Sequence, residues 1–112
     1  MKVETRKVSD VQILDCSGKI TLGDGTMVVR NAVRDILNKG GKKILLNLAD
    51  VSYIDSSGVG ELVSTYTTVS SHGGTLKLLR LSPKTRELLT MTKLLIVFQV
   101  FDDEKVALAS FS

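Results

Sequence analysis

Apolar and polar residues alternate at the start of the chain, in the order that is typical of β-strands. Residues 3–8 and 11–17 are therefore predicted to form two strands, and the intervening Ser9-Asp10 to form a tight turn. Gly, Asp and Thr dominate residues 18–25, so this segment is predicted to be a loop.

Later apolar runs are predicted to complete a sheet. Residues 44–48 are apolar at nearly every position, which indicates a strand covered on both faces in a largely parallel sheet. Residues 76–81 form a second apolar run, and residues 94–101 contain a third. With the first two strands, these runs predict four or five strands in all.

Helical periodicity occurs between these strands. One face of a first helix, which ends at Gly40, carries five apolar residues: Val29, Ala32, Val33, Ile36 and Leu37. A second stripe runs from Val59 to Val69, and Ser82-Pro83 opens a third helix as its N-cap and first residue. The acidic residues 102–104 start a short fourth helix. Strands alternating with helices predict a single α/β domain over residues 1–112, with a four- to five-stranded mixed sheet and about four helices.

Length and charge narrow the class of protein. The 112 residues are 43% hydrophobic and 24% charged, which is typical of one globular domain with a single core. The formal net charge is +3, but basic and acidic residues are interspersed. The densest basic cluster (Lys39, Lys42 and Lys43) only flanks a turn, so nucleic acid is not expected as a partner.

Signals for targeting and metal binding are absent from the sequence. The N-terminus lacks the apolar core of a signal peptide, and the longest apolar run, Leu94 to Phe98, is too short to span a bilayer. The one cysteine, Cys16, alternates with Leu14 on a predicted strand and is interpreted as core packing. No Cys/His cluster is present. We therefore predict a cytoplasmic protein without a membrane partner, a metal or a cofactor.

The sequence argues against catalysis by this chain. A nucleophilic Ser56 or Ser57 would need a base within hydrogen-bond reach. The sole histidine, His72, follows Ser57 by fifteen residues on the same predicted helix, which separates them by roughly 22 Å. Asp55 also occupies the first glycine position of a Gly-x-Ser-x-Gly elbow. We predict no catalytic residue, and we interpret His72 as a partner of the helix dipole.

A hypothesis of another class is a small nucleotide-binding domain that uses Gly23-Asp24-Gly25 and the loop 55–60. A dinucleotide-binding loop would need glycine where Val28 and Val63 stand. A Walker-type loop is missing as well, because Gly41-Lys42 lacks the upstream glycine, where Ile36 stands, and is not followed by Ser or Thr. Tight binding or turnover of ATP or GTP by the isolated protein would favour this alternative.

The segment Asp55-Ser56-Ser57-Gly58-Val59-Gly60 is the clearest chemical feature of the chain. Two hydroxyls and a carboxylate lie where a predicted strand gives way to a predicted helix. One of the two serines is predicted to be the helix N-cap. Gly58 and Gly60 each cost a helix roughly 1 kcal/mol against alanine, so their presence in a first turn suggests that a partner approaches closely.

Residues 51–60, Val51-Ser52-Tyr53-Ile54-Asp55-Ser56-Ser57-Gly58-Val59-Gly60, resemble the signature of the STAS-domain family of bacterial anti-sigma factor antagonists. The resemblance extends over nearly the whole chain. It includes the opening strands with Gly18-Lys19-Ile20-Thr21, the segments 44–48 and 73–78, and the closing residues 97–101. We therefore expect a STAS-type fold.

In that family, the serine immediately before the first glycine is phosphorylated by a partner that is both an anti-sigma factor and a serine kinase. The matching residue is Ser57, with Asp55 as its neighbouring acid. The resemblance implies that the unphosphorylated chain binds this partner and frees a sigma factor, that phosphorylation blocks binding, and that a PP2C-type serine phosphatase resets the switch. The implied partner-binding residues are Asp55, Ser56, Ser57, Gly58, Val59, Gly60, Thr21 and Asp24.

Thr21 departs from the family pattern, because many members have an acidic residue at the end of the corresponding turn. Asp24 is the candidate substitute. It would form a carboxylate pair with Asp55 if their loops met, although two loop acids are more often turn formers. An alternative with the same fold is a non-transcriptional STAS protein, such as a scaffold or a transport-complex subunit.

Overall fold

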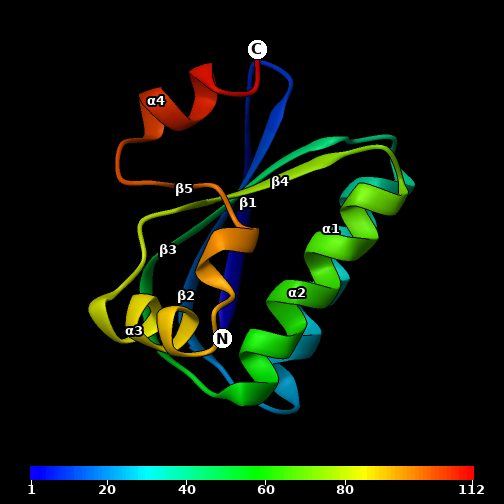
Figure 1. Ribbon diagram of the computed structural model, residues 1–112. Helices are drawn as coiled ribbons and strands as arrows, with labels where there is room; N and C mark the ends of the chain where they lie inside the picture. The colour runs from blue at the N-terminus through cyan, green and yellow to red at the C-terminus, as the bar shows by residue number, and fades with distance from the viewer.

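Five strands form the sheet, in the order β1-β2-β3-β4-β5, in the computed structural model, which describes residues 1–112 (Figure 1). β1 runs antiparallel to β2, and every other neighbouring pair is parallel, so the sheet is mixed as predicted. The strands are β1 (Lys2–Val8), β2 (Val11–Ile20), β3 (Lys43–Ile54), β4 (Thr75–Leu79) and β5 (Val100–Phe101).

Four α-helices accompany the sheet, which confirms the predicted class. They are α1 (Asp24–Asn38), α2 (Ser56–Ser71), α3 (Pro83–Met91) and α4 (Glu104–Ala109), and a 3-10 turn, η1 (Leu95–Val97), precedes β5. α1 and α2 lie side by side, away from α4 (Figure 1). Because β2 and β3 are parallel and each leads directly into one of these helices, α1 and α2 run in the same direction.

The two faces of the sheet are covered unequally. A cluster of 19 buried residues includes the inner faces of α1 and α2 and extends to Leu89 of α3. A second cluster of five buried residues contains Ala107 of α4. Within β3, Ile44 and Leu46 belong to the first cluster and Leu45 to the second. This division confirms that the strand is covered on both faces.

Two strands are longer than the sequence predicted. β2 continues to Ile20 and β3 continues to Ile54. Their parallel pairing contains two register shifts within residues 15–19. Such irregularities disturb the alternation of buried and exposed residues, so the pattern alone placed the strand ends too early. The predicted loop 18–25 is consequently wrong for its first three residues, which belong to β2, and for its last two, which begin α1.

Other element ends also differ from the predictions. β4 stops at Leu79 rather than at residue 81, because Arg80 has a φ of 54° and leaves the extended conformation. The predicted strand within 94–101 is only two residues long, and a 3-10 turn occupies part of the rest. α1 begins at Asp24, ahead of its first apolar stripe residue. The third helix begins at Ser82-Pro83 as predicted, with Ser82 as its side-chain cap.

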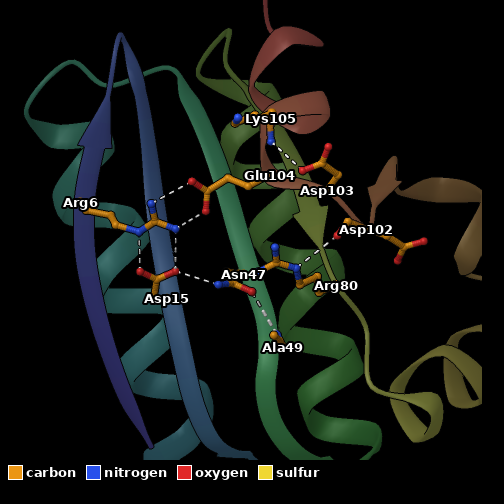
Figure 2. A network of polar contacts seen from close by, with 9 residues as sticks. All are labelled: Arg6, Asp15, Asn47, Ala49, Arg80, Asp102, Asp103, Glu104 and Lys105. Atoms are coloured by element: carbon orange, nitrogen blue, oxygen red, sulfur yellow. Dashed lines mark hydrogen bonds and ion pairs between the residues drawn. The ribbon is translucent and has the colours of Figure 1, made fainter.

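A network of hydrogen bonds and ion pairs connects α4 to the sheet (Figure 2). Arg6 of β1 donates from Nε to Asp15 Oδ2 at 2.6 Å and from Nη1 to Glu104 Oε2 of α4 at 3.1 Å. Asn47 of β3 donates from Nδ2 to Asp15 Oδ1 at 2.8 Å. Hydrogen bonds from Arg6 hold the pKa values of Asp15 and Glu104 below their ordinary range. The network therefore joins three strands and the last helix.

Cys16 lies in the larger core cluster with 2% of its surface exposed. Burial raises the pKa of its thiol to about 12, so the thiolate is scarce at neutral pH. The interpretation of Cys16 as core packing is confirmed.

Candidate functional site

The Asp55–Gly60 segment forms the junction between β3 and α2. Asp55 is the N-cap of α2, with an extended backbone at φ −102° and ψ −175°. Its Oδ1 accepts from the Gly58 N–H at 2.8 Å, and its Oδ2 accepts from the Leu22 N–H at 3.3 Å. One carboxylate thus caps the helix and anchors the loop after β2.

The prediction that Ser56 or Ser57 caps the helix is wrong. Both serines lie inside the first turn of α2, and only the residue before them has the non-helical backbone that an N-cap requires. Neither hydroxyl makes a hydrogen bond to the rest of the chain, although Ser56 is exposed and Ser57 is half-buried. Because Asp55 provides the cap, the Ser57 hydroxyl has no structural task in the helix start.

The two glycines of the segment have different roles. A Cβ at Gly58 would lie 2.1 Å from the Ile20 carbonyl oxygen and 2.5 Å from Ile54 Cγ1. The chain's own packing therefore already requires glycine there, whether or not a partner approaches Gly58. Gly60 is exposed, and a Cβ there would meet no atom within 4 Å. For Gly60, close approach of a partner stays a prediction.

The loop after β2 lies against the start of α2, as the partner-binding prediction required. The Asp55 N–H donates to the Ile20 carbonyl at 3.4 Å, next to Thr21, and the following residue contacts the Asp55 carboxylate. Thr21 is half-buried, and its carbonyl accepts from the Thr26 N–H at 3.2 Å. Asp24 is exposed in the first turn of α1 and makes no side-chain hydrogen bond. Both oxygens of Asp55 accept from backbone amides, and no hydrogen bond joins the Asp55 carboxylate to Asp24.

An ion pair between a half-exposed arginine and a buried glutamate joins α1 to α2 beside this junction, and the sequence did not predict it. Arg30 of α1 donates to Glu61 Oε1 of α2 from Nε at 3.1 Å and from Nη2 at 2.7 Å. The other oxygen, Oε2, accepts from the Thr65 hydroxyl at 3.1 Å. Only 3% of the Glu61 side chain is exposed, and its hydrogen bonds raise the pKa of Arg30. The sequence held one sign of this ion pair: Glu61 is the one acidic residue within the second apolar stripe, from Val59 to Val69.

The segments next to the start of α2 carry exposed large side chains. Leu22, whose amide binds Asp55, is 79% exposed, and Met27 of α1 is 45% exposed. Tyr53, two residues before Asp55 in β3, is 44% exposed. Tyr and Met are among the residue types that are enriched where proteins contact one another. Sequence periodicity could not identify them, because their exposure depends on loop geometry.

His72 lies at the far end of α2, where it is the C-cap. Its Nδ1 is 2.8 Å from the Thr68 carbonyl oxygen, which agrees with the predicted role at the helix C-terminus. No Ser–His pair can form across the length of the helix. None of the helices is both long and apolar enough to cross a membrane.

Together, these features define a small α/β domain with two unbonded serine hydroxyls in the first turn of α2. The STAS domain family model matches residues 2–107, and the chain belongs to this family. A candidate anti-sigma factor antagonist of Thermotoga neapolitana is 33% identical over 101 residues, covering 90% of this chain and 89% of that protein. The resemblance noted in the sequence is confirmed.

Two further proteins support this assignment. The anti-sigma-B factor antagonist of Bacillus subtilis (strain 168) is 34% identical over 86 residues, which cover 77% of this chain and 76% of that protein. The crystal structure of a candidate anti-sigma factor antagonist from Thermotoga maritima has a TM-score of 0.87 and 30% identity. It covers 96% of this chain and 92% of its own.

Proposed function

We propose that this protein is an anti-sigma factor antagonist whose binding is switched at Ser57. In its unphosphorylated form it binds an anti-sigma factor that is also a serine kinase, and a sigma factor is released. Phosphorylation of Ser57 ends the binding, and a PP2C-type serine phosphatase restores it. The chain itself has no catalytic role. Support comes from the family and from relatives that match this chain over most of their own length.

The observation that carries the proposal is the free, half-buried hydroxyl of Ser57 in the first turn of α2. Asp55 supplies the helix cap, so a kinase can use the hydroxyl without removing a structural hydrogen bond. In the transfer, a bond forms between Ser57 Oγ and the γ-phosphorus of ATP while the bond to ADP breaks, and the hydroxyl proton leaves to a base of the kinase. A helix N-terminus tolerates the resulting anion.

Electrostatics are sufficient to make the modification a switch. A phosphate adds about −1.5 to −2 charges. An acidic group of a docked partner about 5 Å away, at an effective dielectric near 20, is repelled by roughly 3 kcal/mol per unit charge. That energy corresponds to about a hundredfold in affinity. Since the effect acts at the surface, the fold need not change.

The partner is expected to contact the residues that surround Ser57. Leu22 and Met27 offer exposed apolar area, and Gly60 leaves the backbone of the first turns accessible. Residues Thr21 and Asp24, on the neighbouring loop, complete the proposed surface with Asp55, Ser56, Gly58 and Val59. Gly58 and Val59 are buried, so their role is to position the exposed residues of this surface rather than to contact the partner.

The test begins with a pull-down in which the dephosphorylated protein is the bait. A recovered kinase-like anti-sigma factor is then incubated with the protein and ATP, and the product is mapped by mass spectrometry. One phosphate at Ser57 is expected. Ser57→Ala should stay unmodified and still bind, whereas Ser57→Asp should bind about a hundredfold more weakly.

Ser56→Ala is the matched control, because it removes the neighbouring exposed hydroxyl and should leave both modification and binding unchanged. Phosphate at Ser56, or normal binding by Ser57→Asp, would contradict the proposal. Recovery of a transporter subunit instead of an anti-sigma factor would favour the non-transcriptional alternative. Stoichiometric binding of ATP or GTP without a partner would favour the nucleotide-binding one.

A further inference from the structure

One edge of the Arg30 guanidinium is free of oxygen acceptors. Nε and Nη2 both donate to the Glu61 carboxylate, at 3.1 and 2.7 Å. The third nitrogen, Nη1, faces the sulfur of Met27 at 3.9 Å, and a thioether is only a weak acceptor. The Arg30 side chain is 41% exposed, whereas that of Glu61 is 3% exposed. The guanidinium therefore binds a buried carboxylate on one side and is open on the other.

Ser57 lies on the same side of α2 as Glu61. The two residues are four positions apart, so their Cβ atoms are neighbours at about 5–6 Å. The Glu61 Oε1 binds Arg30, and its Oε2 accepts from Thr65, one turn farther along α2. Ser57 and the acid of the ion pair therefore occupy successive turns on one face of α2.

The open edge of the Arg30 guanidinium faces the N-terminal ends of α1 and α2. Met27 is one turn before Arg30, so Nη1 points toward the N-terminus of α1. α1 and α2 run side by side in the same direction, and both begin at the carboxyl ends of parallel strands (Figure 1). The N-terminal direction of α1 is therefore also the direction of Ser57.

We propose that Arg30 is the internal phosphate ligand of the switch, and that Nη1 donates to a phosphate oxygen when Ser57 is phosphorylated. This inference rests on the proposed function, because it concerns the phosphorylated form. The guanidinium keeps its bonds to Glu61 and adds a second anion on its open edge, as planar guanidinium groups do in charge-assisted pairs. The phosphate is then held across the seam between α1 and α2, over the surface that a partner would contact.

Other charged groups near this end of the helices do not replace Arg30. Asp55 and Asp24 are acids, and Asp55 is already bonded to two backbone amides. Arg34 is one turn farther along α1 and lines the same groove between the helices, but it has no hydrogen bond to Glu61. Arg34 is therefore a matched control for a cation on the same helix.

The experiment installs phosphoserine at position 57 during synthesis of the full chain, so that neither kinase nor partner is needed. The second ionisation of the phosphate is followed by ³¹P NMR across a pH titration. A cation within about 4–6 Å lowers the pKa of an anionic group by about 1–3 units. The phosphate should therefore titrate lower in the protein than in a peptide of the same sequence.

The decisive comparison is between Glu61→Gln and the double variant Arg30→Gln/Glu61→Gln. Both lack the buried carboxylate, so the second does not leave an unpaired buried charge, and they differ only in Arg30. The phosphate pKa should be about one unit higher in the double variant. An Arg30→Lys exchange in the Glu61→Gln background should keep part of the lowering, and Arg34→Gln should keep all of it.

Equal phosphate pKa values in Glu61→Gln and the double variant, with native amide spectra for both, would overturn the inference. That outcome leaves the proposed function intact, because kinase specificity and partner binding are measured separately. Conversely, if no kinase modifies Ser57, the proposed function fails while the installed phosphoserine still reports on Arg30. The two failures are therefore distinguishable.

Discussion

Exchange of the two glycines of the Asp55–Gly60 segment for alanine should have opposite effects on stability. At Gly58, the added Cβ would lie 2.1 Å from the Ile20 carbonyl oxygen, about 1.3 Å short of an ordinary contact at 3.4 Å. The obstacle is a backbone atom in the last residue of β2, so relief requires a shift of the start of α2. At Gly60, the Cβ would enter open space.

The magnitudes follow from two competing effects. Alanine favours a helix over glycine by roughly 1 kcal/mol. Overpacking a well-packed site costs about 1–3 kcal/mol, and the upper end applies to Gly58 because a second contact, with Ile54 Cγ1 at 2.5 Å, is also too short. Gly58→Ala should therefore lower the free energy of unfolding by about 2 kcal/mol, and Gly60→Ala should raise it by up to about 1 kcal/mol.

Urea unfolding followed by far-UV circular dichroism measures both values. The midpoint should move in opposite directions while the slope stays constant, since the same surface is exposed on unfolding. In thermal unfolding, a change of 1 kcal/mol corresponds to about 4 °C in a domain of this size. Gly58→Ala at least as stable as the native chain would refute the packing argument. Gly60→Ala that is destabilised would refute the claim of open space.

Three further predictions concern the cap, the α4 network and the core. Asp55→Ala should lose about 1–2 kcal/mol of stability in urea, and Asp55→Asn, which keeps an acceptor, should lose less; equal losses would contradict the cap. Arg6 lowers the pKa values of Asp15 and Glu104, so their pairing stabilises the fold above about pH 5 and is lost as the pH falls through those lowered values. Arg6→Met should therefore reduce the urea midpoint at pH 7 and flatten its decline below pH 5, and parallel curves would refute this. Cys16 should react with a thiol reagent in urea but not in the native state, because its thiol is buried; rapid native labelling would contradict the assignment.

Periodicity predicted the α/β class and the helices because it records which side chains face a core. It was least accurate for β2 and β3, where register shifts displace the alternation and the strands continue to Ile20 and Ile54. Both strands are paired backbone to backbone in that region, and the sequence carries little information on such pairing. The ends of β2 and β3 are therefore visible in the structure but not in the sequence pattern.

Arg30 and Asp55 show two other limits of sequence reasoning. Arg30 is on the polar side of α1, but that side packs against α2, so the arginine forms an ion pair with a buried acid. Which helices become neighbours is a property of the whole fold. Asp55 competes with two serines for the cap, and all three residue types are good N-caps. The position at which the extended backbone of β3 turns into a helix decides between them.

The start of α2 combines a fixed backbone with a free surface, and this combination suits a switch that acts without refolding. Asp55 and Gly58 hold the backbone in place through the cap and through contact with the end of β2. Ser57 and Gly60 belong to the same two turns, yet neither is needed for that packing. A charge added at Ser57 therefore changes what a partner meets, while the residues that position the helix keep their contacts. For this reason, variants of Ser57 should alter binding without altering stability, whereas variants of Asp55 or Gly58 should alter both.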